Sequence, residues 1–357
     1  MSRPRARSLY SGFVAAVAFA AAALTPAAHA GHPLETAAAP APVKIKLATV
    51  APKGSSYYKG LQTIGERWKE HSGGAIQLVV YGDSTQGGET DVVKKMRTDV
   101  LGGALLTVAG LGEIEPKVTC LQNLPMMFRD LDEVEHVREA LRPKLEEQLA
   151  QKGYVALFWS DVGFVRFFTT KPLLVPEELK TRKLFVWAGD ADQMDLWRKN
   201  GVNPVSLEAT EIVQGLQTGL IDTVSMPPLY ALAIQADKPA PHMLDINWAP
   251  LVGAAVVTRK AWDQVAPAQR EGLLEIAREV GRDINAKGRG ENDAAIAALV
   301  KRGVKVHSPT PEQLEAWRAF GLGTHPSLRD RLVPAAMIEE VGAVLAAYRA
   351  ERAAAPR

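Results

Sequence analysis

Arg166 is the charged residue whose surroundings say most about the chemistry of this sequence. It lies inside the apolar run Phe164–Phe168, where a guanidinium is costly to bury unless a partner neutralises it. The guanidinium is planar and permanently charged, and it can donate two parallel hydrogen bonds to one carboxylate. That carboxylate can belong to a bound ligand or to an internal acidic residue, because structural ion pairs are frequent. Arg166 is therefore a candidate ligand-binding residue with a structural alternative.

A second set of candidates consists of large apolar side chains in the same part of the chain. Phe185, Trp187, Met226 and Trp248 fall at predicted strand ends or in connecting segments. Ligand pockets are mostly apolar, so these side chains can line one. Each of them can equally belong to the core, which is the usual place of a large apolar residue. The candidate ligand-binding set is completed by two residues of the first part of the chain, Tyr57 and Thr107.

The sequence contains no recognisable catalytic or metal-binding motif. None of the seven histidines pairs with another at a spacing such as H-E-x-x-H, and neither a G-x-S-x-G elbow nor a P-loop occurs. Gly110 and Gly112 begin like a dinucleotide motif, but Glu115 stands where the third glycine is required. We therefore expect no enzyme activity, no cofactor and no metal. Catalytic triads are recognised by geometry rather than spacing, so a secreted hydrolase remains an alternative, as does a structural periplasmic protein.

The elements that must position these residues are clearest in the stretch Asn203–Pro228. An apolar run follows an Asn-Pro turn signal, and residues 209–218 then place apolar side chains at helical spacing. Gly219 can take the left-handed conformation that ends a helix, and residues 220–226 form another apolar run that stops at two prolines. The pattern predicts strand, short helix and strand. The ends of such parallel strands form a natural edge for a ligand.

The first 42 residues indicate export from the cytoplasm. A basic start precedes the apolar run 13–24, which is too short for a comfortable membrane span, and Ala28-His29-Ala30 fits a cleavage pattern. We expect a signal peptide over residues 1–30, cleavage after Ala30, and an Ala/Pro-rich tether without structure over residues 31–42. Removing the three leader arginines leaves 39 basic against 40 acidic residues, which does not suggest a nucleic acid as partner.

The rest of the chain alternates predicted strands and helices, which indicates an α/β protein. Residues 43–50 and 76–81 are predicted strands, each followed by a helical pattern. Helical periodicity also runs over Pro267–Arg302, where one long helix could cross both halves of the molecule. Gly288 and Gly290 make a bend in this helix equally possible.

Several motifs resemble the periplasmic solute-binding proteins of TRAP transporters, the DctP type. The stretch 203–228 is similar to their E…LQxGxxDxxxxP signature, and residues 171–183 are similar to their KP…PEDLKG…K segment. Arg166 and Thr169 fit the family's R-x-x-T spacing, and residues 124–128 fit its LPFLF-like run. The resemblance covers about residues 43–341.

This resemblance implies a two-lobed periplasmic binding protein fold with a ligand cleft between the lobes and a long helix that spans both. The lobes would close around the ligand. On the family plan, lobe one comprises residues 43–160 and 250–285, lobe two comprises residues 161–249 and 286–340, and a C-terminal helix and tail follow over residues 341–357.

Two positions depart from the family pattern. Family members usually carry K-I-R-V after the PEDLKG segment, and that arginine is their main carboxylate clamp, whereas Phe185 stands in its place here. Met226 likewise replaces an asparagine that often faces the ligand in the family. The resemblance keeps Arg166 as a contributor to carboxylate recognition. In a buried cleft these replacements remove hydrogen-bond partners and add apolar surface.

Three functional hypotheses follow. The first is an extracytoplasmic solute-binding protein of the periplasm that captures a largely apolar monocarboxylate or a lipid-like molecule and delivers it to TRAP-type membrane permease subunits. The second is the same role for an ordinary small mono- or dicarboxylate, with Arg166 as the only clamp. The third, of another class, is the secreted hydrolase or structural periplasmic protein.

Overall fold

The computed structural model describes residues 41–354, which form an α/β fold with two separate β-sheets. The predicted signal peptide and cleavage site, and most of the predicted tether, lie outside the described residues. No helix within residues 41–354 combines the length and the apolar character that crossing a membrane requires.

The first sheet, which defines lobe one, has the strand order β2-β1-β3-β10-β4. Its first three strands are mutually parallel, whereas β10 runs antiparallel to β3 and β4. The strands β3, β4 and β10 are buried on both faces, as expected for apolar and β-branched runs covered by helices, whereas β1 and β2 carry exposed residues on one face. They are β1 (Val43–Thr49), β2 (Ile76–Tyr81), β3 (Gly103–Thr107), β4 (Tyr154–Phe164) and β10 (Pro250–Thr258).

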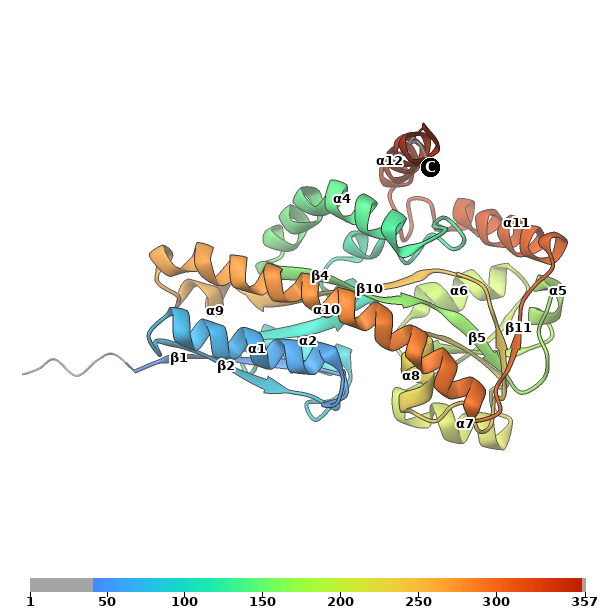
Figure 1. Cartoon of the computed structure of the whole chain (residues 1–357), viewed down its shortest axis with the longest axis horizontal. Helices are drawn as coiled ribbons and strands as arrows, with labels where there is room; N and C mark the ends of the chain where they lie inside the picture. Colours follow the sequence, from blue (N-terminus) through green and yellow to red (C-terminus); the bar gives the residue numbers. More distant parts are fainter. Residues whose placement is uncertain (1–40, 355–357) are drawn as a thin grey trace, which may run out of the picture. The chain divides into compact units, whose positions relative to one another are not determined.

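Helices cover both faces of this sheet. One face packs against α1 and α10, which lie side by side in Figure 1, and the other packs against α2, α3, α4 and α12. The bounds are α1 (Ser56–His71), α2 (Glu89–Arg97), α3 (Val108–Ile114), η1 (Pro116–Thr119), α4 (Leu131–Gln151), α9 (Arg259–Asp263), α10 (Pro267–Lys301) and α12 (Ala335–Ala354). The last helix begins at Ala335, before the predicted boundary at 341.

The second sheet, which defines lobe two, has the strand order β11-β9-β5-β8-β6-β7. Its strands are β5 (Arg166–Thr169), β6 (Lys183–Trp187), β7 (Asn203–Leu207), β8 (Thr223–Met226), β9 (His242–Leu244) and β11 (Lys305–His307). Its helices are α5 (Pro176–Leu179), α6 (Ala191–Lys199), η2 (Ala209–Glu211), α7 (Ile212–Thr218), α8 (Pro228–Ala233) and α11 (Pro311–Leu328).

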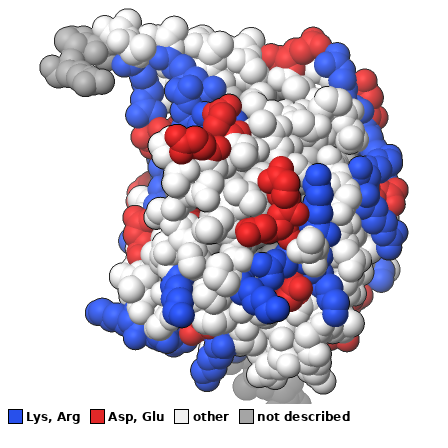
Figure 2. All heavy atoms as spheres, turned by 90° about the vertical axis from the view of Figure 1, so that its right-hand side faces the viewer, with Lys and Arg blue, Asp and Glu red and all other residues white. Residues whose placement is uncertain are grey.

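On the face that Figure 2 shows, basic and acidic side chains lie interspersed.

The predicted strand–helix–strand unit is present between residues 203 and 228. Both β7 and β8 pair with β6 in parallel, and α7 connects them. Gly219 ends α7 with a φ of 73°, the left-handed conformation that glycine adopts without strain. The carboxyl ends of β6 and β8 therefore meet at one edge of the sheet, where the sequence predicted the ligand.

The helix α10 is continuous over 35 residues and is not interrupted at Gly288 or Gly290. It contacts α1 and β4 of lobe one and α8 of lobe two, as Figure 1 shows. A Cβ atom on Gly288 would lie 2.2 Å from the hydroxyl oxygen of Tyr57. Gly288 thus permits close approach of α1 to the long helix.

Two chain segments pass between the lobes and pair with each other. One is the junction of β4 and β5 at Val165, and the other leads from β9 to β10. The amide of Val165 donates to the carbonyl of Ala249 at 2.8 Å, and the amide of Trp248 donates to the carbonyl of Val165 at 3.3 Å. This paired crossover places Arg166, the first residue of β5, at the edge of lobe two beside the passage between lobes.

Candidate ligand-binding site

The structure brings four of the sequence-predicted residues together at one edge of the second sheet. Arg166 pairs directly with Met226 across β5 and β8, so their side chains share a face of the sheet. Phe185 and Met226 belong to one hydrophobic cluster and are only 2% and 1% exposed. Trp187 ends β6, meets Phe185 edge-on at 4.9 Å between ring centroids, and is half-buried. We call these four residues the lobe-two group.

Arg166 has an internal acidic partner, as expected if it forms a structural ion pair. Its Nη1 atom lies 2.7 Å from a carboxylate oxygen of Asp245. The side chain is 15% exposed, and its Nε atom is buried without a hydrogen-bond partner among the described residues. Burial lowers the pKa of Arg166, while the negative charges of Asp245 and Asp293 act in the opposite direction. The guanidinium is therefore paired but incompletely hydrogen-bonded.

Trp248 lies apart from the lobe-two group. It packs in an aromatic cluster with Phe167, Trp197 and Trp317, at centroid distances of 5.4, 5.7 and 5.9 Å. Phe167 and its neighbour Phe168 belong to different clusters, because successive residues of a strand point to opposite faces of a sheet. Trp248 therefore covers the face of β5 opposite Met226.

Tyr57 also lies away from the lobe-two group. Its hydroxyl donates a 2.8 Å hydrogen bond to the carbonyl of Asp161, a fully buried residue of β4. Burial, together with the negative charge of Asp161, raises the pKa of Tyr57. These contacts fasten α1 to the strand that leads into the crossover.

Thr107 ends β3 and caps α3, and it belongs to a site that the sequence did not reveal. Both its amide and its hydroxyl donate to the carboxylate of Glu89, at 2.9 Å each, and the amide of Gly110 donates at 2.7 Å. Glu89 is buried, and burial raises the pKa of its carboxyl. An acidic residue in the first turn of a helix is common at exposed positions, so its sequence carried no distinctive signal.

Tyr230 links the lobe-two group with the charge of Glu89 in lobe one. Tyr230 lies against Trp187, with ring centroids 6.2 Å apart, and its pKa is raised by burial and by the negative charge of Glu89. Nearby, the Gln193 side-chain amide donates to Asn123 of lobe one at 3.0 Å. The bond between Gln193 and Asn123 is thus a direct contact between the lobes, and the charge of Glu89 acts across to Tyr230. The combination offers apolar and aromatic surface, one guanidinium and one buried carboxyl, which suits binding.

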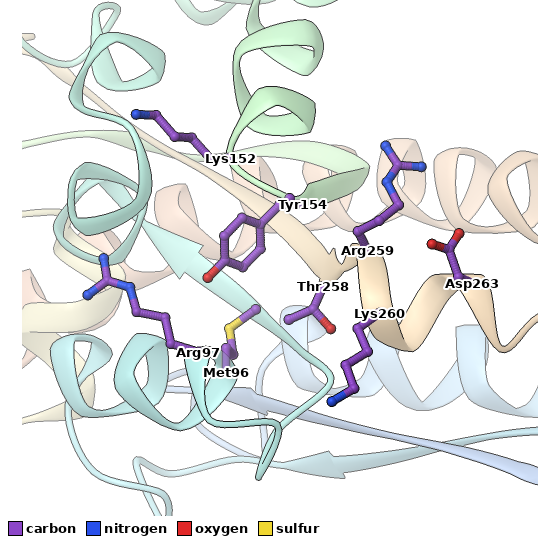
Figure 3. A pocket seen from close by; sticks show the side chains of 9 residues that line it. Met96, Arg97, Lys152, Tyr154, Thr258, Arg259, Lys260 and Asp263 are labelled. Carbon is purple, nitrogen blue, oxygen red and sulfur yellow. The ribbon is translucent and has the colours of Figure 1, made fainter.

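Two other features of the described residues do not contribute to this site. A surface cavity of about 630 Å³ in lobe one is lined by basic side chains that point away from one another in Figure 3. The imidazoles of His242 and His307 form a hydrogen bond of 2.9 Å. Within residues 41–354, no group of three or more His, Cys, Asp or Glu side chains is arranged to hold a metal ion.

Comparison with known proteins agrees with this architecture. The family described as "Bacterial extracellular solute-binding protein, family 7" (DctP) matches residues 47–322. The "C4-dicarboxylate-binding periplasmic protein DctP" of Rhodobacter capsulatus is 24% identical over 293 residues, which cover 82% of this chain and 88% of that protein.

Solved structures show the same fold at low sequence identity. A TRAP periplasmic solute-binding protein of Sulfurospirillum deleyianum with bound succinate has a TM-score of 0.77 at 22% identity, covering 85% of this chain and 99% of that one. A protein of the same kind from Xanthobacter autotrophicus, with bound β-D-galacturonate, has a TM-score of 0.77 at 18% identity and the same coverage.

These findings confirm the two-lobed fold and the family that the motifs predicted. They also decide against the hydrolase and the structural protein, because the related proteins bind solutes and are not enzymes. The family match covers more than half of the chain, and the chain therefore belongs to the DctP family of bacterial extracellular solute-binding proteins.

Proposed function

We propose that this protein captures a small organic ligand with a sizeable apolar portion in the periplasm and delivers it to a TRAP-type membrane permease. The observation that carries the proposal is the burial of Phe185 and Met226 beside Arg166. The ligand is a monocarboxylate or an uncharged, lipid-like molecule. Its apolar body would lie against Trp187 and Tyr230, which are only partly buried, whereas Phe185 and Met226 form the core beneath them.

The charge of the lobe-two group argues against two carboxylates on one ligand. Arg166 is the only cation among these four side chains. A dicarboxylate would place its second carboxylate against apolar walls, where it would lose hydration without replacement. By contrast, burying about 150 Å² of apolar ligand surface would contribute on the order of 4 kcal/mol.

The action of the protein follows from contacts in both lobes. A ligand between Trp187 or Tyr230 of lobe two and the Glu89–Thr107 region of lobe one would favour the closed arrangement by its higher affinity for it. The closed form would then dock on the permease. Small-angle scattering should give a smaller radius of gyration for the liganded protein, and identical profiles for verified apo and liganded samples would exclude this closure.

Transport of a small mono- or dicarboxylate is the second candidate. The Rhodobacter capsulatus relative is named for C4-dicarboxylates, and the Sulfurospirillum deleyianum neighbour holds succinate. In this case Arg166 would exchange its internal partner for the ligand carboxylate.

Mass spectrometry of the molecule that co-purifies with the protein is the most direct test. Calorimetry on refolded, ligand-free protein should follow, with succinate and malate compared against medium-chain and aromatic acids and their uncharged analogues. We expect the apolar ligands to bind more tightly. Tighter binding of the dicarboxylates would refute the first candidate and support the second.

A further inference from the structure

The position of Asp245 determines how much charge Arg166 can offer to a ligand. Asp245 directly follows Leu244, which pairs with Phe167 across β9 and β5, so the antiparallel register places it beside Arg166. Its amide donates to the carbonyl of His307 at 2.9 Å, which fixes its backbone on β11. The ion pair of 2.7 Å is thus held by the sheet itself rather than by two loose surface side chains.

Arg166 already has a negative partner in Asp245. The charge of Asp293, on α10, also acts on the guanidinium. A ligand carboxylate would enter as a third negative charge or would have to displace Asp245. Like charges brought together at a binding site oppose association, and this disfavours an anionic head group.

The guanidinium still needs a hydrogen-bond acceptor. Asp245 engages Nη1, whereas Nε is buried and has no hydrogen-bond partner within residues 41–354, so a ligand atom can approach it only when the lobes open. A neutral carbonyl, ether or hydroxyl oxygen can accept a hydrogen bond here without adding charge. A neutral oxygen on the ligand would therefore accept the hydrogen bond that the ion pair with Asp245 does not satisfy.

We infer that Asp245 acts as an internal counter-ion that sets the ligand class of this site, and that the ligand is an uncharged, oxygen-bearing molecule with an apolar body. This inference rests on the proposed function and narrows it. Asp245 is a specificity-determining residue, and Arg166 serves as a hydrogen-bond donor rather than as a clamp for an anion.

The test compares acids with their amides on the same apolar body. Decanoate and decanamide, and phenylacetate and phenylacetamide, are titrated into refolded, ligand-free protein by calorimetry. The wild-type protein should bind each amide at least about tenfold more tightly than the acid. Asp245→Asn, which keeps the shape and removes the charge, should reverse or abolish that preference. Asp293→Asn should shift it in the same direction by a smaller factor.

Glu279→Gln is the matched control, because it also removes one negative charge from an arginine pair, that of Arg67 on the outside of α1 and α10. It should leave the acid-to-amide ratio unchanged. Thermal melts verify that each variant is folded, and the exposed Asp293 provides a variant if Asp245→Asn does not fold.

The outcomes separate this inference from the proposed function. If the apolar compounds bind but the wild type prefers the acids, and neither variant changes the ratio, Asp245 does not set the ligand class while the proposed function stands. If only succinate and malate bind, the proposed function fails and this inference fails with it.

Discussion

Two clusters of charge lie on either side of the crossover between the lobes, and they differ in how many ion-pair partners the central charge has. In the Asp161 cluster, Asp161 accepts from Arg138 at 2.9 Å and from Arg289 at 3.3 and 3.4 Å. In the other cluster, Arg166 has one ion-pair partner among residues 41–354, Asp245. Within the same residues, the Nε atoms of Arg138 and Arg166 are both buried without a hydrogen-bond partner, so the clusters do not differ in this respect.

The two clusters also differ in how far their charged side chains are exposed to solvent. Asp161 is fully buried and its partner Arg138 is 3% exposed, whereas Asp245 is 39% exposed. A buried charge that loses its partner has no water to replace it, while an exposed one can be rehydrated. The Asp161 cluster thus has the properties of a structural fastening for β4, and the Arg166 pair has those of a site that can adapt to a ligand.

The largest effect should come from breaking the Asp161 cluster. Asp161→Ala leaves Arg138 buried without its nearest counter-ion, and we expect a loss of about 3–5 kcal/mol in the free energy of unfolding. Urea denaturation measures this loss. Asp192→Ala, which breaks an arginine pair on the surface, serves as control and should cost far less. Equal losses in both variants would remove the distinction drawn here.

Breaking the Arg166 pair should cost less stability and more specificity. Arg166→Met leaves only the partly exposed Asp245 unpaired, so we expect a loss of about 1–2 kcal/mol in the free energy of unfolding. In calorimetry, Arg166→Met should weaken any carboxylate ligand, while an uncharged ligand should lose less than about tenfold in affinity. A loss of stability as large as that of Asp161→Ala would identify Arg166 as a structural residue.

The sequence predicted the elements of this site better than the contacts within it. The order of strand, helix and strand between residues 203 and 228 follows from local signals, because Gly219 and the prolines after Met226 fix where the elements end. Apolar periodicity also located the long helix. The periodicity did not show why Gly288 is a glycine. The reason is the close approach of Tyr57, and this contact depends on how α1 packs against α10.

The partners of the candidate residues depend on strand pairing, which the sequence does not encode locally. Asp245 becomes the neighbour of Arg166 only because β9 pairs with β5. Trp248 was a candidate because it lies in a connecting segment, and its position against Trp197 and Trp317 depends on where two helices pack. Glu89 was missed as a site residue because the GG-E loop, although it resembles the family, does not show that this carboxyl is buried.

Glu89 extends the comparison to a buried carboxyl that has hydrogen bonds but no cationic partner. Burial raises its pKa above the usual 4.5, so the folded protein takes up this proton at a higher pH than the unfolded chain. Its contribution to stability therefore increases as the pH falls from the folded-state pKa toward 4.5, and it is smallest above that pKa.

The variant Glu89→Gln tests the direction of this pH dependence, because glutamine keeps the shape of the side chain and cannot titrate. The free energy of unfolding of the wild type minus that of the variant should rise as the pH is lowered from 7 toward 4.5. Taking the difference cancels the titration of the other carboxyls. A difference that stays constant with pH would mean that the hydrogen bonds from Thr107 and Gly110 compensate fully for burial.

The smallest change in stability should arise at the pair His242 and His307, whose second member is hydrogen-bonded to the backbone of Asp245. His242 and His307 share one hydrogen between Nδ1 and Nε2 at 2.9 Å, so the contact cannot persist when both rings are protonated. Burial, followed by the charges of His307, Lys305 and Arg182, lowers the pKa of His242 below its usual 6.5. The unfolded chain then binds more protons between 6.5 and the folded-state pKa, so stability falls as the pH drops through that range.

We expect the wild type to lose about 0.5–1 kcal/mol of stability on this account, the net value of one hydrogen bond. His307→Asn should reduce the pH dependence measured by urea denaturation between pH 7 and 5. Because the carbonyl of His307 accepts from the amide of Asp245, the protection factor of that amide in hydrogen exchange, which corrects for slower intrinsic exchange at lower pH, should fall on acidification in the wild type. An unchanged protection factor with a normal loss of stability would show that the pair supports β11 without influencing the counter-ion of Arg166.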